Sequence, residues 1–71
     1  MKYKQKKSEL ARWRYARGLT LREIAEATGV DTSTVHYWEV RGISPPYLRK
    51  VSEVTGIPTR KLRPDLAELF D

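Results

Sequence analysis

Short hydrogen-bonding side chains are concentrated between positions 32 and 37 of this 71-residue chain, where the sequence reads TSTVHY. Hydroxyl, imidazole and phenol groups donate and accept hydrogen bonds at the edges of DNA base pairs, and a threonine methyl can contact a thymine methyl. Val35 and Trp38 are apolar and three positions apart, which is typical of a helix with one buried face. The pattern therefore predicts a helix whose polar side is free to enter the major groove of DNA.

The same segment holds the residue types of a hydrolase triad in Asp31, Ser33 and His36. These three lie within two turns of one short helix, whereas a triad needs its members to converge at a pocket with an oxyanion hole. The chain has no cysteine and one histidine, which excludes disulfides, thiolate chemistry and Cys- or His-rich metal sites. We therefore expect no enzyme activity, no metal, no cofactor and no small-molecule ligand.

Residues 21–40 have the pattern of a helix-turn-helix that would hold this polar helix outward. Ala25 is small, as two closely crossing helices require, and Gly29 permits the left-handed backbone of a tight turn. Thr20 and Glu23 have the spacing of a capping box at the start of the first of the two helices. The apolar residues expected to fill the space around the two helices are Ile24, Val30, Val35 and Trp38.

The rest of the chain predicts further short helices and no sheet, because no segment alternates apolar and polar residues between turn signals. We expect an all-α, compact four- to five-helix bundle with a lambda-repressor-like arrangement. The second helix of the helix-turn-helix is expected to begin at Asp31 or Thr32 and to end between Val40 and Gly42. A helix at 9–17 would be capped by Ser8 and ended by Gly18, and a helix at 45–55 would be capped by Ser44 and ended by Gly56. A short helical turn from Pro58 or Thr59 to Leu62 and a last helix at 65–71 complete the set. The expected core also contains Leu10, Trp13, Leu48, Val51 and Val54.

Positive charge is concentrated at the N-terminal end. The chain carries a formal charge of +5, and residues 1–17 contain seven basic residues against one acidic residue. Such a cluster favours a polyanionic partner, with nucleic acid first and anionic lipid second. Residues 1–7 read either as a flexible basic arm that follows a DNA groove or as a tail with no fixed register. The longest apolar stretches, such as Leu69-Phe70, are two residues, so we expect no membrane-spanning segment.

Two stretches, LARWRYARGLTLREIAEATGVDTSTVHYWE at 10–39 and VTGIPTRKLRPDL at 54–66, carry a resemblance to a known family. The chain resembles the lambda-repressor-like helix-turn-helix regulators, the Cro/repressor class of phage and bacterial proteins. This resemblance implies a regulator that binds double-stranded operator DNA, usually as a homodimer on a pseudo-palindromic site. It also implies an ion pair between Arg14 and Glu39, and base contacts from the first residues of the second helix.

The residues and the resemblance together give a set of candidate DNA contacts. Base contacts are expected from Thr32, Ser33, His36 and Tyr37. Phosphate contacts are expected from Lys4, Lys6, Lys7, Arg14, Arg22, Thr34 and Arg41. Asp31 would repel phosphate, so it is expected to cap the helix or to accept from cytosine. The family often has Gln where this chain has Leu21, and the altered loop VRGISPP puts a backbone phosphate contact there in doubt.

The expected organisation is a basic flexible arm at 1–7, a DNA-binding domain at 8–63 and a C-terminal segment at 64–71. Leu66, Leu69 and Phe70 in that last segment have helical spacing and could cover a partner subunit. A DNA-binding function predicts a cytoplasmic, nucleoid-associated protein. The alternatives are a protein-binding helix-turn-helix, such as an antitoxin or adaptor, and a DNA-packaging or excision recogniser. The protein-binding alternative is favoured by residues 18–43, where four acidic residues outnumber two basic ones.

Overall fold

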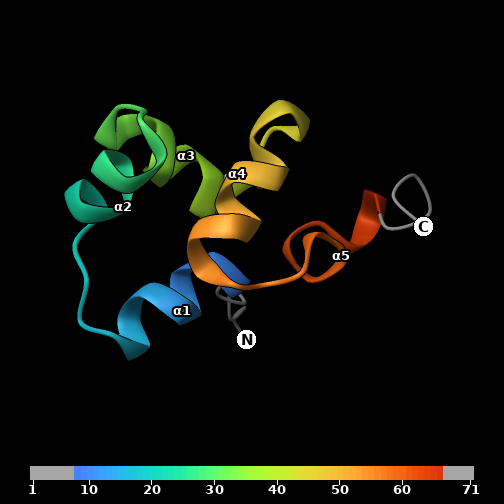
Figure 1. Cartoon of the computed structure of the whole chain (residues 1–71), viewed down its shortest axis with the longest axis horizontal. Coiled ribbons are helices and arrows are strands. Elements are labelled where there is room, and N and C mark those ends of the chain that lie inside the picture. The colour runs from blue at the N-terminus through green and yellow to red at the C-terminus, as the bar shows by residue number, and fades with distance from the viewer. Residues whose placement is uncertain (1–7, 67–71) are drawn as a thin grey trace, which may run out of the picture.

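The computed structural model describes residues 8–66, which form five α-helices and one 3₁₀ turn with no strand among them (Figure 1). The elements are α1 (Glu9–Ala16), α2 (Leu21–Thr28), α3 (Thr32–Arg41), α4 (Pro45–Thr55), α5 (Thr59–Leu62) and η1 (Pro64–Leu66). The all-α helical bundle expected from the sequence is confirmed.

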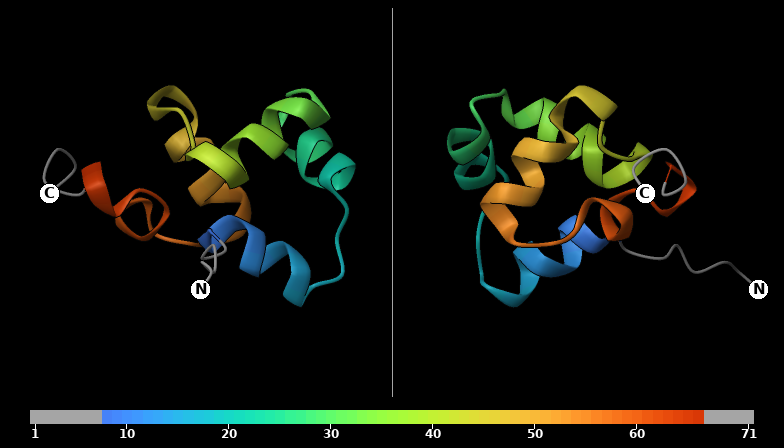
Figure 2. Two further views of the ribbon diagram at one scale, coloured as in Figure 1. Left: turned by 180° about the vertical axis from the view of Figure 1, so that it is seen from behind. Right: turned by 45° about the vertical axis from the view of Figure 1, so that its right-hand side comes forward.

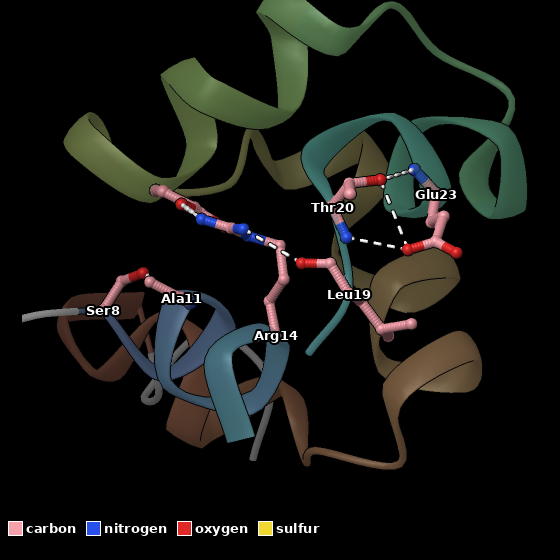
Figure 3. Close-up of polar contacts among 7 residues, drawn as sticks. Ser8, Ala11, Arg14, Leu19, Thr20 and Glu23 are labelled. Atoms are coloured by element: carbon pink, nitrogen blue, oxygen red, sulfur yellow. Dashed lines mark hydrogen bonds and ion pairs between the residues drawn. The ribbon is translucent and has the colours of Figure 1, made fainter. Parts of the chain in front are cut away.

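Local capping interactions set the start of α1 and both ends of α2. The Ser8 hydroxyl accepts a hydrogen bond from the Ala11 backbone N–H at 3.0 Å (Figure 3). At α2, the Thr20 hydroxyl accepts from the Glu23 N–H at 3.1 Å, and the Glu23 carboxylate accepts from the Thr20 N–H at 2.8 Å. Gly29 ends α2 with a left-handed φ of 77°. The capping box and the turn glycine predicted by the sequence are therefore both present.

Two other expected caps differ in the structure. Asp31 and Ser44 occupy the N-cap positions of α3 and α4, but neither side chain makes a capping hydrogen bond. At α4, Pro45 and Pro46 have no backbone N–H, so the first turn has fewer N–H groups for a capping side chain to accept from. The first helix also ends at Ala16, one residue before the predicted end. The capping role expected of Asp31 is therefore wrong for its carboxylate, although its backbone carbonyl does accept from the helix.

One continuous apolar core joins all five helices. Its buried members are Leu10, Ile24, Ala25, Val35, Trp38, Ile43, Leu48, Val51 and Leu62. Val35 and Trp38 are 0% and 1% exposed, so the inner face of α3 is packed entirely against the core. Ala25 is also buried, where a small side chain permits α2 to cross close to α3. This core holds α3 in a fixed orientation relative to the rest of the molecule.

Three core residues depart from the sequence expectation. Ile43, assigned from the sequence to a loop, is 2% exposed and belongs to the same buried apolar cluster as Leu62 of α5. Val54, expected in the core, is only half-buried. Trp13 is also half-buried and packs against the core, and the guanidinium of Arg17 lies 4.4 Å from the centre of its ring.

Several candidate residues lie outside the described part of the chain. These are the arm residues Lys4, Lys6 and Lys7 and the C-terminal residues Leu69 and Phe70. Leu66 is described, and it packs partly buried against the core.

Candidate nucleic-acid interface

The outward side of α3 carries the residues that the sequence predicts as base contacts. Thr32, Ser33, His36 and Tyr37 are all exposed, while the opposite side of the same helix is buried. Spacings of three and four residues place Ser33, His36 and Tyr37 on one stripe of the helix. In the rear view of Figure 2, α3 lies across the front of the molecule.

The hydrolase alternative finds no support in this geometry. No hydrogen bond joins Asp31, Ser33 and His36 to one another among the described residues. All three are exposed, so they do not line an enclosed pocket. In residues 8–66, no three His, Cys, Asp or Glu side chains gather in a way that could hold a metal ion.

A nearly buried ion pair fixes α3 against α1. Arg14 Nε donates to Glu39 Oε2 at 2.6 Å, and Arg14 NH2 donates to Glu39 Oε1 at 3.0 Å. The third guanidinium nitrogen donates to the Leu19 carbonyl oxygen at 3.1 Å (Figure 3). The hydrogen bonds to Glu39 raise the pKa of Arg14 above its ordinary value. This is the pair that the resemblance implies, and it also ties down the α1–α2 loop.

The same geometry bears on the second role expected of Arg14, a phosphate contact. Its side chain is 10% exposed, and each of its three nitrogens already donates to a protein oxygen. These bonds use three of the five N–H groups and hold the guanidinium in one orientation. The structure therefore gives Arg14 a structural role, and the phosphate contact expected of it stays a prediction.

The other described phosphate candidates differ in accessibility. Arg22, near the start of α2, is exposed and lies 3.6 Å from Glu26, which is a weak surface pairing. Arg41 is exposed at the last position of α3. Thr34 is half-buried, which limits what its hydroxyl can reach. Among the described phosphate candidates, Arg22 and Arg41 are therefore the arginines whose side chains are exposed.

A second arginine, which sequence reasoning missed, holds the loop that follows α3. Arg63 NH1 donates to the Ile43 carbonyl oxygen at 2.6 Å, and its other two nitrogens donate to the Asp65 carboxylate at 3.0 and 2.7 Å. The hydrogen bonds between Arg63 and Asp65 raise the pKa of Arg63 and lower the pKa of Asp65. The Arg63 stem lies so close to Gly42 that a Cβ there would be 3.3 Å from it. Gly42, which the sequence analysis placed at the end of this helix, was a signal for this contact.

No helix among the described residues is long and apolar enough to span a bilayer.

Comparison with known proteins gives one match. A family model described as helix-turn-helix matches residues 10–62, which is most of the chain and runs from the second residue of α1 to the end of α5. Neither the curated proteins nor the solved structures contain a significant match.

Proposed function

Because the chain belongs to the helix-turn-helix family of DNA-binding regulators, we propose that it is a sequence-specific transcriptional regulator that inserts α3 into the major groove of duplex DNA. In this proposal, Thr32, Ser33, His36 and Tyr37 contact base edges. An α-helix fits the major groove, and each base pair there presents a distinct pattern of donors, acceptors and methyl groups.

One observation carries the proposal: the division of α3 into a fully buried side and a hydrogen-bonding exposed side. Val35 and Trp38 hold the helix rigidly, and the Arg14–Glu39 pair fixes its distance from α1. A rigid helix loses little conformational entropy on binding, so its exposed side chains can discriminate between bases. Tyr37 is 55% exposed although its ring is large, which favours a partner surface over core packing.

Phosphate contacts in the proposal come from Arg22, near the start of α2, and Arg41, at the end of α3, with a weaker one from Thr34. Lys4, Lys6 and Lys7 supply further positive charge from the segment that precedes α1. Contacts of this kind position the protein on the duplex and add affinity without reading sequence.

We further propose that two copies bind a pseudo-palindromic operator. A helix-turn-helix dimer places its two recognition helices about 34 Å apart on one face of the duplex. The segment 64–71 is the proposed contact between copies, since Leu66, Leu69 and Phe70 are apolar and close in sequence. Two helices reading equivalent half-sites would give the selectivity that a single short helix lacks.

Selection from random duplex DNA, followed by a titration of the recovered sequence at several salt concentrations, tests this function. We expect an enriched motif and an affinity that falls steeply as salt rises, because bound phosphates release counterions. Failure to enrich any sequence, together with weak salt dependence, would instead favour the protein-binding alternative. The observation that favours this alternative is the group of exposed acidic side chains on α2 and at the start of α3, which are Glu23, Glu26 and Asp31.

A further inference from the structure

An open groove lined by basic side chains lies beside the C-terminal end of α3. Three elements far apart in sequence surround it: the start of α1, the end of α3 and the α5–η1 segment. In the rear view of Figure 2, these segments meet on the side of the molecule across which α3 lies. Its charged lining residues are Glu9, Arg12, Arg41, Lys61, Arg63 and Asp65.

The positive charges of the groove are incompletely neutralised. Arg63 is paired with Asp65, and Arg12 is only 3.8 Å from Glu9, with both side chains well exposed. No acidic group lies within ion-pair distance of Arg41 or Lys61 among the described residues. Gathering unneutralised cations costs folding free energy through mutual repulsion, and a bound anion removes that cost.

The length of α3 indicates which anion this groove would meet. A helix of ten residues is about 15 Å long, whereas the major groove is about 12 Å wide. When the start of α3 contacts base edges and the helix axis runs across the groove, the far end of α3 reaches the edge of the groove, where the phosphates lie. Arg41 is at that end, and Arg12 and Lys61 flank it on α1 and α5.

We propose that this groove binds the DNA sugar-phosphate backbone and that Arg12 and Lys61 are phosphate contacts in addition to Arg41. The inference rests on the function proposed above and extends the DNA footprint to α1 and α5. Arg63 has a structural role in the groove, since its three nitrogens already donate to Ile43 and Asp65. It shapes the wall of the groove and keeps the end of α3 beside α5.

Two single variants, Arg12→Ala and Lys61→Ala, test the proposal in the full chain, with Arg60→Ala as the matched control. Arg60 is an exposed cation next to Lys61 on α5 but does not line the groove. The probes are a duplex recovered by selection and a scrambled duplex of the same length. For each groove variant we expect weaker binding to both duplexes and a salt slope, in log Kd against log salt concentration, that is smaller by about 0.9. Arg60→Ala should keep the wild-type slope.

The outcomes separate this inference from the proposed function. If the wild-type chain binds with steep salt dependence and both groove variants keep its slope, the groove is not a phosphate site, while the proposed function stands. If the wild-type chain itself binds no duplex, the proposed function and the groove fall together. Sedimentation of each variant without DNA completes the test, because a shifted monomer–dimer equilibrium with an unchanged slope would assign the groove to contact between copies. Circular dichroism checks that the variants, each an exposed side chain, remain folded.

Discussion

Arg14 and Glu39 are 25 residues apart in sequence, yet two hydrogen bonds of 2.6 and 3.0 Å join their side chains between α1 and α3. Both side chains are about nine-tenths buried. A buried pair of this kind contributes less net stability than its short distances suggest, because both charges have lost their hydration. Its geometric role is clearer, since it fixes α1 and the start of α2 relative to the helix that carries the exposed stripe.

Glu39→Gln should destabilise the fold by about 2–4 kcal/mol, because it leaves the Arg14 charge buried without its counter-charge. Urea unfolding followed by circular dichroism measures the change. The matched control is Glu26→Gln, which removes an exposed carboxylate paired with Arg22 and should cost less than about 0.5 kcal/mol. Equal unfolding midpoints for the two variants would contradict the structural role of the Arg14–Glu39 pair.

Gly42→Ala should cost about 1–3 kcal/mol of unfolding free energy. The backbone at Gly42 has φ 112° and ψ 152°, a region that is essentially reserved for glycine. The added Cβ would also press against the Arg63 stem at 3.3 Å. Gly18→Ala is the control, since Gly18 has φ 65° with no atom near its missing Cβ. In thermal unfolding, the midpoint temperature of Gly42→Ala should be clearly lower than that of Gly18→Ala. A higher midpoint for Gly42→Ala would contradict the packing of Arg63 on Gly42.

Acid should weaken the attachment of η1 to the loop after α3. Hydrogen bonds from Arg63 lower the pKa of Asp65 in the folded chain below the ordinary value of 3.8. The stability that this carboxylate contributes is therefore present above pH 3.8 and is lost as the pH falls through its folded pKa. The stability difference between the wild type and Asp65→Asn should be largest near neutrality and should shrink below pH 4 (about the ordinary pKa of Asp). A difference that stays constant across this range would contradict the linkage.

Ser33→Ala and Tyr37→Ala should each relax base preference at one or two positions, by about 1–3 kcal/mol of discrimination. Both side chains are exposed on α3, so neither substitution removes core packing. Ser52→Ala, on α4, is the control for the serine variant and should keep the wild-type preference. Competition binding against single-base variants of the selected duplex measures the effect. A Tyr37→Ala chain with full wild-type preference would remove Tyr37 from the reading surface.

Patterns confined to a few residues were predictable from the sequence, and contacts between distant segments were not. The Thr20–Glu23 capping box and the Gly29 turn depend on neighbouring residues, so their spacing alone predicts them. The Arg14–Glu39 pair spans 25 positions and came only from the family resemblance. Exposure of the α3 stripe followed from helical periodicity around Val35 and Trp38.

The loop after α3 is where sequence reasoning was least informative. Ile43 is buried in the apolar core with Leu62, and Arg63, twenty positions later, donates to its carbonyl oxygen. Nothing in the local pattern around Gly42 and Ser44 distinguishes such a buried residue from one in an exposed loop. The basic groove was missed for the same reason, since Arg12, Arg41 and Lys61 come together only through the packing of three elements.

The most direct test of the central claim is selection from random duplex DNA with the wild-type chain and with Ser33→Ala in parallel. If the exposed side of α3 reads bases, the wild type will enrich one motif and Ser33→Ala will enrich the same motif with one or two positions degenerate. Two identical motifs would contradict the reading role of Ser33, and the absence of any motif for the wild type would contradict sequence-specific recognition by α3.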